Sequence, residues 1–285
     1  MKNTLLLSCF FLLFFSACKK QTIIDEDNPP PVINNVSSVK IENYVNRIFI
    51  DLLGREPLDT ELTVETQALR AADLETPARL ALIIKLQTAT DTIPGDTTYT
   101  QAYHQHLYAL AKARCLEGAS DLDIDDYISG SDDSLTIMRL EAVKHSRTDL
   151  QTGEISIEEM FGRMINNAVY DDINMNTFNF VRASFDNLLW RFPTDYEFQS
   201  GFSMIEDGTE ETLFGQTGSS KEDYMEILIS SPAMFEGMII WAYRQLLARN
   251  PTTTETVALL ENFYLTKDFQ TVQRTVMVTD EYAGF

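Results

Sequence analysis

The first residues that could do chemistry are aspartates spaced two apart. Asp121, Asp123 and Asp125 alternate with other residues, as the first ligands of a calcium-binding loop do. Such a loop needs a glycine at its sixth position and a glutamate at its twelfth, where this chain has Asp126 and Asp132. We therefore expect a solvated acidic loop, with a calcium site as the alternative, and no other metal site.

Patterns typical of catalysis or of a cofactor are not found. His104 and His106 lie two residues apart, which on a helix turns them to different faces, and His145 is distant in sequence. The chain has no zinc-protease motif, no nucleophile elbow, no phosphate-binding glycine loop and no haem-attachment motif. Cys115 lies in a helical apolar pattern, which favours a small buried hydrophobe over a nucleophile. We expect no cofactor and no catalytic activity.

One motif recurs three times in the chain. It reads aromatic-x-x-Leu-Leu-x-Arg-x-Pro-x-x-x-Glu at 49–61, 185–197 and 243–255, with no gap. Upstream, apolar residues come in pairs four apart, which indicates one buried face of an amphipathic helix. The proline forbids that helix to continue, and a capping box opens a second helix in the last two copies. The repeat therefore predicts a helix, a tight corner and a second helix.

Each corner carries one arginine and one glutamate. The arginine falls at the C-terminus of the first helix, where a cation suits the helix dipole. A structural clamp between the two side chains is expected, because a need of the architecture recurs in every copy and a single active site does not. A ligand-binding charge pair is the alternative. The pairs are Arg55 with Glu61, Arg191 with Glu197, and Arg249 with Glu255.

A third helix is predicted after each corner. In the first copy, Thr76 is the expected N-cap of this helix and Pro77 its first helical residue. Asp59 is the expected cap of the helix that follows the corner, because Leu58 stands at the cap position. The third helices are predicted over 76–86, 221–229 and 269–278. Between the first two copies, a loop over 90–96 and helices over 101–117 and 157–164 are expected.

These patterns predict an all-α protein. Repeated helix-corner-helix units form one helical domain behind a lipidated, disordered N-terminal tether. The expected segments are a signal peptide over 1–17, the tether over 18–40, the first repeat over 41–95, a helical insert with loops over 96–176, the second repeat over 177–236 and the third over 237–285.

The first corner has a family resemblance. The segment 44–57, which contains Leu52-Leu53-Gly54-Arg55-Glu56-Pro57, resembles the opening of bacterial helical domains of unknown function. One such group accompanies cytochrome-like modules in planctomycete-type secreted proteins, and another is a surface-protein repeat with the same corner. The resemblance implies an exported helical module and carries no catalytic residue to this chain. Copies two and three have Trp190 and Ala248 in place of the glycine.

The N-terminus resembles the leader of a bacterial lipoprotein. Lys2 precedes an apolar run over 5–15, and Ser16 and Ala17 then precede Cys18. The run is too short for a transmembrane helix. The resemblance implies cleavage before Cys18, which then carries diacylglyceryl and N-acyl groups. An ordinary secretory leader is the alternative.

The segment after Cys18 is predicted to be an extended tether. It holds Asp25-Glu26-Asp27 and the prolines at 29–31, with little that could form a core. Lys19 and Lys20 follow the cysteine without the aspartate that retains enteric lipoproteins in the inner membrane, so the resemblance implies the outer membrane. The acidic cluster is similar to surface-export signals of Bacteroidetes lipoproteins but lies further from the cysteine. Periplasmic and surface-facing orientations therefore both stay open.

The net negative charge of the chain limits the classes of partner that we expect. Without the leader the chain has 21 basic and 43 acidic side chains, which disfavours nucleic acid and anionic lipid headgroups. We expect a lipid-anchored envelope protein without catalytic activity, an accessory or scaffold subunit that binds another envelope protein. A lipoprotein that captures a glycan or peptide between repeats is the alternative. Tyr103, Trp190, Phe192 and Trp241 are the candidates for its lining, and core packing is expected for most of them. An enzyme of unknown type is the second alternative.

The leader yields a direct test. Cys18→Ser should block both lipidation and the associated cleavage, because the acyl chains attach to the thiol. Labelling cells with a radioactive fatty acid measures this, and label that still enters the variant protein would contradict the lipoprotein assignment.

Overall fold

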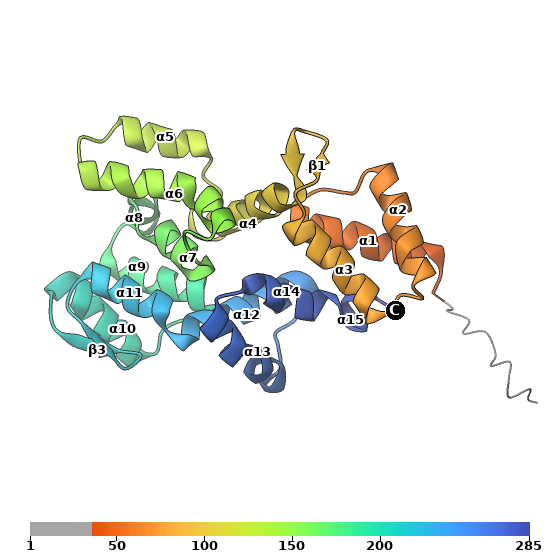
Figure 1. Cartoon of the computed structure of the whole chain (residues 1–285). Coiled ribbons are helices and arrows are strands. Elements are labelled where there is room, and N and C mark those ends of the chain that lie inside the picture. The colour runs from red at the N-terminus through yellow and green to blue at the C-terminus, as the bar shows by residue number, and fades with distance from the viewer. Residues whose placement is uncertain (1–35) are drawn as a thin grey trace, which may run out of the picture. The chain divides into compact units, whose positions relative to one another are not determined.

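The computed structural model describes residues 36–285, and within them the expected all-α fold is confirmed. Figure 1 shows helices joined by short turns, with two small hairpins as the only strands of this part. The leader, Cys18 and most of the expected tether lie outside the described residues. The first helix of the described residues, α1, begins at Ser38, inside the segment expected to be tether.

All three copies of the repeat form a helix, a corner, a second helix and a third helix. Copy two differs because its first helix ends in a π-helical segment, η1, and its second continues into another, η2. Copy one consists of α1 (Ser38–Leu53), α2 (Asp59–Ala71) and α3 (Thr76–Thr88). Copy two consists of α9 (Thr177–Ser184), η1 (Phe185–Leu189), α10 (Asp195–Phe202), η2 (Ser203–Asp207), the hairpin of β3 (Glu211–Leu213) and β4 (Gln216–Gly218), and α11 (Lys221–Ser230). Copy three consists of α12 (Pro232–Leu247), α13 (Thr253–Thr266) and α14 (Phe269–Met277), and is followed by α15 (Asp280–Ala283).

The insert between copies one and two is more helical than expected. The expected loop over 90–96 contains the strand β1, which pairs with the next segment as a short antiparallel hairpin. The elements are β1 (Thr92–Ile93), β2 (Thr97–Thr98), α4 (Tyr99–Cys115), α5 (Asp121–Ser129), α6 (Ser134–Thr152), α7 (Ile157–Ile165) and α8 (Ala168–Asn174). The nineteen-residue α6 was not predicted.

Copy three packs against both of the other copies. Its α12 contacts η1 of copy two, while α14 contacts α3 and α15 contacts α1 of copy one. Helix α4 of the insert packs on α1 and α3, and also on α6 and α7. In Figure 1, copy three (dark blue) accordingly lies between copy one (orange) and copy two (cyan). Helix α15 therefore packs on α1, which lies more than 200 residues earlier in the chain.

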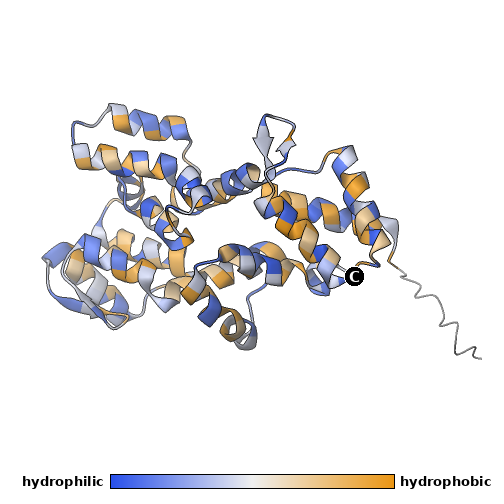
Figure 2. Cartoon of the chain, viewed as in Figure 1, coloured by the Kyte–Doolittle hydropathy of each residue, from blue (hydrophilic) through white to orange (hydrophobic). Residues whose placement is uncertain are grey.

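The helices bury one face each. Figure 2 shows orange and blue alternating around most of them, as expected where an apolar stripe faces the core. In α1 the buried residues include Ile41, Tyr44, Ile48 and Leu52, at spacings of three and four. The Tyr44 hydroxyl donates to the carbonyl of Met277, at 3.1 Å, which ties α1 to the end of α14.

The three corners share one backbone conformation. The residue that ends the first helix is left-handed in every copy, with φ of 68° at Gly54, 55° at Trp190 and 53° at Ala248. Glycine adopts this region freely, whereas a side chain makes it cost about 1–2 kcal/mol. In copy two the cost is offset by contacts, because the guanidinium groups of Arg114 and Arg244 lie 3.9 and 5.0 Å from the Trp190 ring.

Two expected helix starts in copy one are wrong. The residue before α3 is Glu75, so Thr76 is the first helical residue and Pro77 the second. The cap position of α2 is Leu58, not Asp59, and the Glu61 carboxylate accepts the Leu58 N–H at 2.8 Å. Glu61 therefore supplies one half of a capping box, and Leu58 has no side-chain acceptor to supply the other half.

Within 36–285, no single helix is long and apolar enough to cross a bilayer. Helices α11 and α12, which join at a bend of 59°, are long and apolar enough only when taken together, judged by length and composition.

Candidate functional site

The structure brings together all three predicted arginine–glutamate pairs. Each guanidinium binds its glutamate in a bidentate arrangement, with Nη1 donating to Oε2 and Nη2 donating to Oε1. The paired Nη1–Oε2 and Nη2–Oε1 distances are 2.7 and 2.8 Å for Arg55 and Glu61, 2.8 and 2.6 Å for Arg191 and Glu197, and 3.0 and 2.7 Å for Arg249 and Glu255.

Each pair also closes the corner backbone. The arginine Nη1 donates to the carbonyl of the next residue, which is Glu56, Phe192 or Asn250, at 3.0–3.1 Å. The glutamate Oε2 accepts the backbone N–H at the helix cap, three residues before it, at 2.6–2.8 Å. Because these groups are engaged by the protein itself, the geometry favours the clamp over a ligand-binding pair.

The surroundings of the three clamps differ. The hydroxyl of Tyr99 donates to Glu61 at 2.8 Å, and Glu61 is only 9% exposed. Burial raises its pKa, but the hydrogen bonds from Arg55, the Leu58 N–H and Tyr99 outweigh burial and hold the pKa below 4.5. Arg249 instead adds a second carboxylate, Glu281, at 2.6 and 2.7 Å.

The acidic segment at 121–126 is neither a loop nor a calcium site. It is the start of α5, capped by Ser120, and its three aspartates have separate partners. Asp121 accepts from Lys112 at 2.6 Å and from Tyr108 at 2.9 Å. Asp123 accepts the Ser120 N–H, and Asp125 pairs with Lys144. Acidic residues suit the first turn of a helix, which explains the pattern without a metal.

The remaining chemistry-bearing residues do not converge. Across 36–285, no group of three or more His, Cys, Asp or Glu side chains is placed to hold a metal ion. His104 is buried in α4 with Nδ1 2.7 Å from the Thr100 carbonyl, and burial lowers its pKa. His145 lies on α6, with Nδ1 2.8 Å from the Glu141 carbonyl. Cys115 is buried as expected, and burial raises the pKa of its thiol to about 12, which keeps it protonated.

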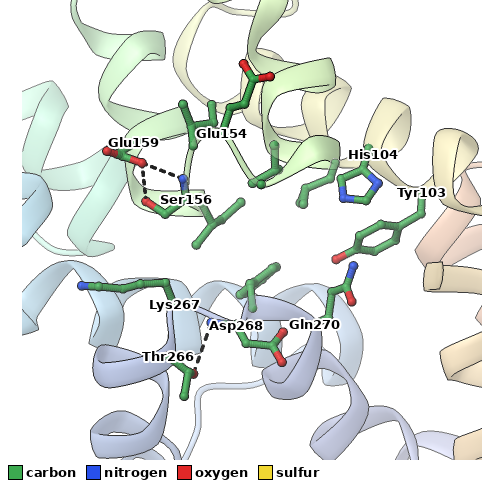
Figure 3. Close-up of a pocket in the computed structure, with 15 residues that line it drawn as sticks. Tyr103, His104, Glu154, Ser156, Glu159, Thr266, Lys267, Asp268 and Gln270 are labelled. Carbon is green, nitrogen blue, oxygen red and sulfur yellow. Dashed lines mark hydrogen bonds between the residues drawn. The ribbon is translucent and has the colours of Figure 1, made fainter.

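A cavity of about 470 Å³ opens between α4, the turn before α7 and the turn between α13 and α14 (Figure 3). Tyr103 is the one residue of the four expected aromatics that lines it. Trp241 is buried against Phe269, whose ring stacks on it at 5.3 Å. Trp190 is half-buried at its corner, and Phe192 is on the surface. The four candidates therefore do not line one cleft, and the core packing expected for most of them is found for Tyr103 and Trp241.

Most polar groups of this cavity already have a partner in the protein. In Figure 3, Glu159 accepts from Ser156, and Lys267, Asp268 and Gln270 lie opposite. Asp268 caps α14 through Thr271, and the Lys267 ammonium lies 3.3 Å from Glu158. The Nε2 atom of His104 and the side-chain N–H₂ of Gln270 have no hydrogen-bond partner among the described residues. The cavity thus offers few free groups that could orient a ligand.

Exposed aromatic side chains gather at the second corner, in a surface that we call the aromatic patch. Phe178 is 46% exposed and Phe192 64% exposed. The Phe178 ring packs edge-on against Phe198 at 5.1 Å, and Phe198 stacks on Phe202 at 5.9 Å. The Arg182 guanidinium lies over both Phe178 and Phe192, at 5.2 and 5.7 Å from the ring centres. The aromatic patch consists of Phe178, Arg182, Phe192, Phe198 and Phe202.

Of this patch, Phe192 alone was predicted from the sequence to be a binding residue. Aligning the three copies would have found more of it, because the exposed patch residues are specific to copy two. The positions of Phe178 and Phe192 hold glutamates in copy one, Glu42 and Glu56, and hold Glu236 and Asn250 in copy three. A corner therefore does not need aromatic residues there.

Comparisons of the chain with protein-family models, with curated proteins and with solved structures found no match.

The clamps lead to a ranked prediction of stability. Arg55→Ala should lower the free energy of unfolding by about 1–3 kcal/mol, because it leaves the buried Glu61 carboxylate without its cation. Arg191→Ala and Arg249→Ala should cost about 1 kcal/mol, since solvent screens these more exposed pairs. Chemical denaturation measures the three values. Arg182→Ala is the control, because its side chain donates no hydrogen bond, and a loss as large as that of Arg55→Ala would contradict the clamp.

Acid should weaken the corners. The pKa of a glutamate is 4.5 when free of contacts, and the hydrogen bonds from Arg191 and Arg249 lower the pKa of Glu197 and Glu255 to about 2. Because the folded pKa is the lower one, the stabilisation is complete above about pH 4.5 and is lost as the pH falls toward about 2. Denaturant titrations over this range should show a flatter decline for Glu197→Gln than for the exposed control Glu210→Gln. Equal slopes would contradict the assignment.

Proposed function

We propose that this protein is a lipid-anchored envelope protein without catalytic activity, an accessory or scaffold subunit that binds another envelope protein. The leader pattern that ends at Cys18 supports the anchor, and the lysines at 19 and 20 support the outer membrane. The acidic balance supports a protein partner over nucleic acid.

The observation that carries the proposal is the aromatic patch. Soluble surfaces normally carry scattered apolar residues, whereas contiguous exposed aromatics with an arginine are typical of binding surfaces. Here two exposed phenylalanines flank Arg182 on one corner, and the same positions of the other two corners are polar or acidic. The repeat architecture therefore does not account for them, and a partner does.

The test is co-purification from membranes. Full-length tagged protein is extracted in mild detergent, and the partner that co-purifies is identified by mass spectrometry. The double variant Phe178→Ala with Phe192→Ala should lose the partner while keeping its melting temperature, because both side chains are exposed. The matched control is Val257→Ala with Leu265→Ala, which removes exposed apolar side chains of α13. Full recovery of the partner with the patch variant, or the absence of any partner with the wild type, would contradict the proposal.

A second candidate is the capture of a glycan or peptide in the cavity at Tyr103 and His104, where the Nε2 atom of His104 and the side-chain N–H₂ of Gln270 are free polar groups. The cavity volume of about 470 Å³ falls within the range of small-molecule sites. This candidate predicts a ligand bound far from the second corner, which substitutions in the aromatic patch would leave in place.

A further inference from the structure

Arg182 is an exception among the arginines of residues 36–285. Every other arginine there donates at least one hydrogen bond to a carboxylate, a carbonyl, a hydroxyl or an amide oxygen. The Arg182 side chain donates none, and its contacts are the two phenylalanine rings. In a chain with 43 acidic residues, a guanidinium without an acceptor is unexpected.

The two rings hold this guanidinium in place without using its donors. A cation over an aromatic face is attracted by the ring electrons, so Phe178 and Phe192 restrict where the side chain lies. All five N–H donors stay free to meet an acceptor. A carboxylate is the acceptor that matches the guanidinium fork in both charge and shape.

The flanking surface specifies what surrounds that carboxylate. A phenylalanine side chain cannot form a hydrogen bond. The hydroxyl groups of a ligand packed on Phe178 or Phe192 would therefore lose their hydrogen bonds to water and gain none from the protein. This disfavours a sugar chain. Arg182 is the one basic residue of the aromatic patch, and the protein as a whole is strongly acidic. Both features disfavour polyanions and anionic lipid surfaces, which need clustered basic residues. An acidic side chain between apolar side chains satisfies both the cation and the rings.

We propose that the aromatic patch binds a segment of the partner protein in which one Asp or Glu lies between apolar residues. Its carboxylate pairs with Arg182, and the apolar side chains pack on Phe178 and Phe192. This inference rests on the proposed function, since it describes how the partner is recognised. The equivalents of Arg182 in the other copies are Asn46 and Ile240, so the same recognition is confined to copy two.

Photo-crosslinking from position 192 tests the inference. The full-length protein is made in cells with a benzoylphenylalanine in place of Phe192, and the partner peptide joined on irradiation is sequenced. The matched control places the same group at Glu56, the equivalent position of copy one. We expect a peptide with Asp or Glu flanked by apolar residues, obtained from position 192 and not from position 56.

Substitution of Arg182 in the same chain supplies the second readout. Arg182→Gln should reduce the crosslink about tenfold or more, as for an interface arginine at the centre of a contact. Arg182→Lys should retain more, because it keeps the charge and loses the fork. An unchanged yield with Arg182→Gln, a crosslinked segment without an acidic residue, or adducts with lipid or glycan would overturn the inference. A partner that still co-purifies in those cases leaves the proposed function standing, whereas the absence of any partner overturns both.

Discussion

The two-pronged contact between arginine and glutamate at the corner is the interaction on which the repeat depends. A helix that stops at a left-handed residue leaves carbonyl groups unpaired, and a helix that starts after a proline leaves N–H groups unpaired. One ion pair engages both sides of the connection. The arginine donates to the carbonyl of the residue after it, beyond the end of the first helix, and the glutamate accepts the N–H at the cap of the second helix. The corner thereby turns the chain in a few residues without burying unpaired polar groups.

Local signals made these corners predictable from the sequence. Apolar spacing, proline and the threonine caps act within one turn of helix, so they predicted all nine helices of the three copies, although the cap at Leu58 and the start of α3 were misassigned. The aspartates at 121, 123 and 125 were misread for the converse reason. Alternate acidic residues suit both a calcium loop and a helix start. The segment forms a helix here because Ser120 caps its first turn and Ile124 packs in the core.

The features that could not be predicted arise from packing between distant segments. In copy two the first helix widens into η1 where α12 crosses it. A side chain at Gly237 of α12 would lie 2.3 Å from the Leu188 carbonyl oxygen, so the two backbones meet directly. Arg114, from the insert, donates to the carbonyls of Asp186 and Asn187 in this irregular turn. No pattern within either segment encodes this meeting, because it needs a glycine, an irregular turn and an arginine from three different parts of the chain.

Comparing the three copies distinguishes residues that the repeat needs in order to fold from residues that it does not need. Arg191 and Arg182 lie nine residues apart in the same copy, and both are exposed. Arg191 recurs in every copy and makes three hydrogen bonds at the corner, so its role is complete within the chain. Arg182 does not recur, makes no hydrogen bond and is positioned by two exposed rings. Selection for folding accounts for the first arrangement. The second holds a guanidinium that has no hydrogen-bond acceptor among the described residues, and the proposed binding role rests on this difference.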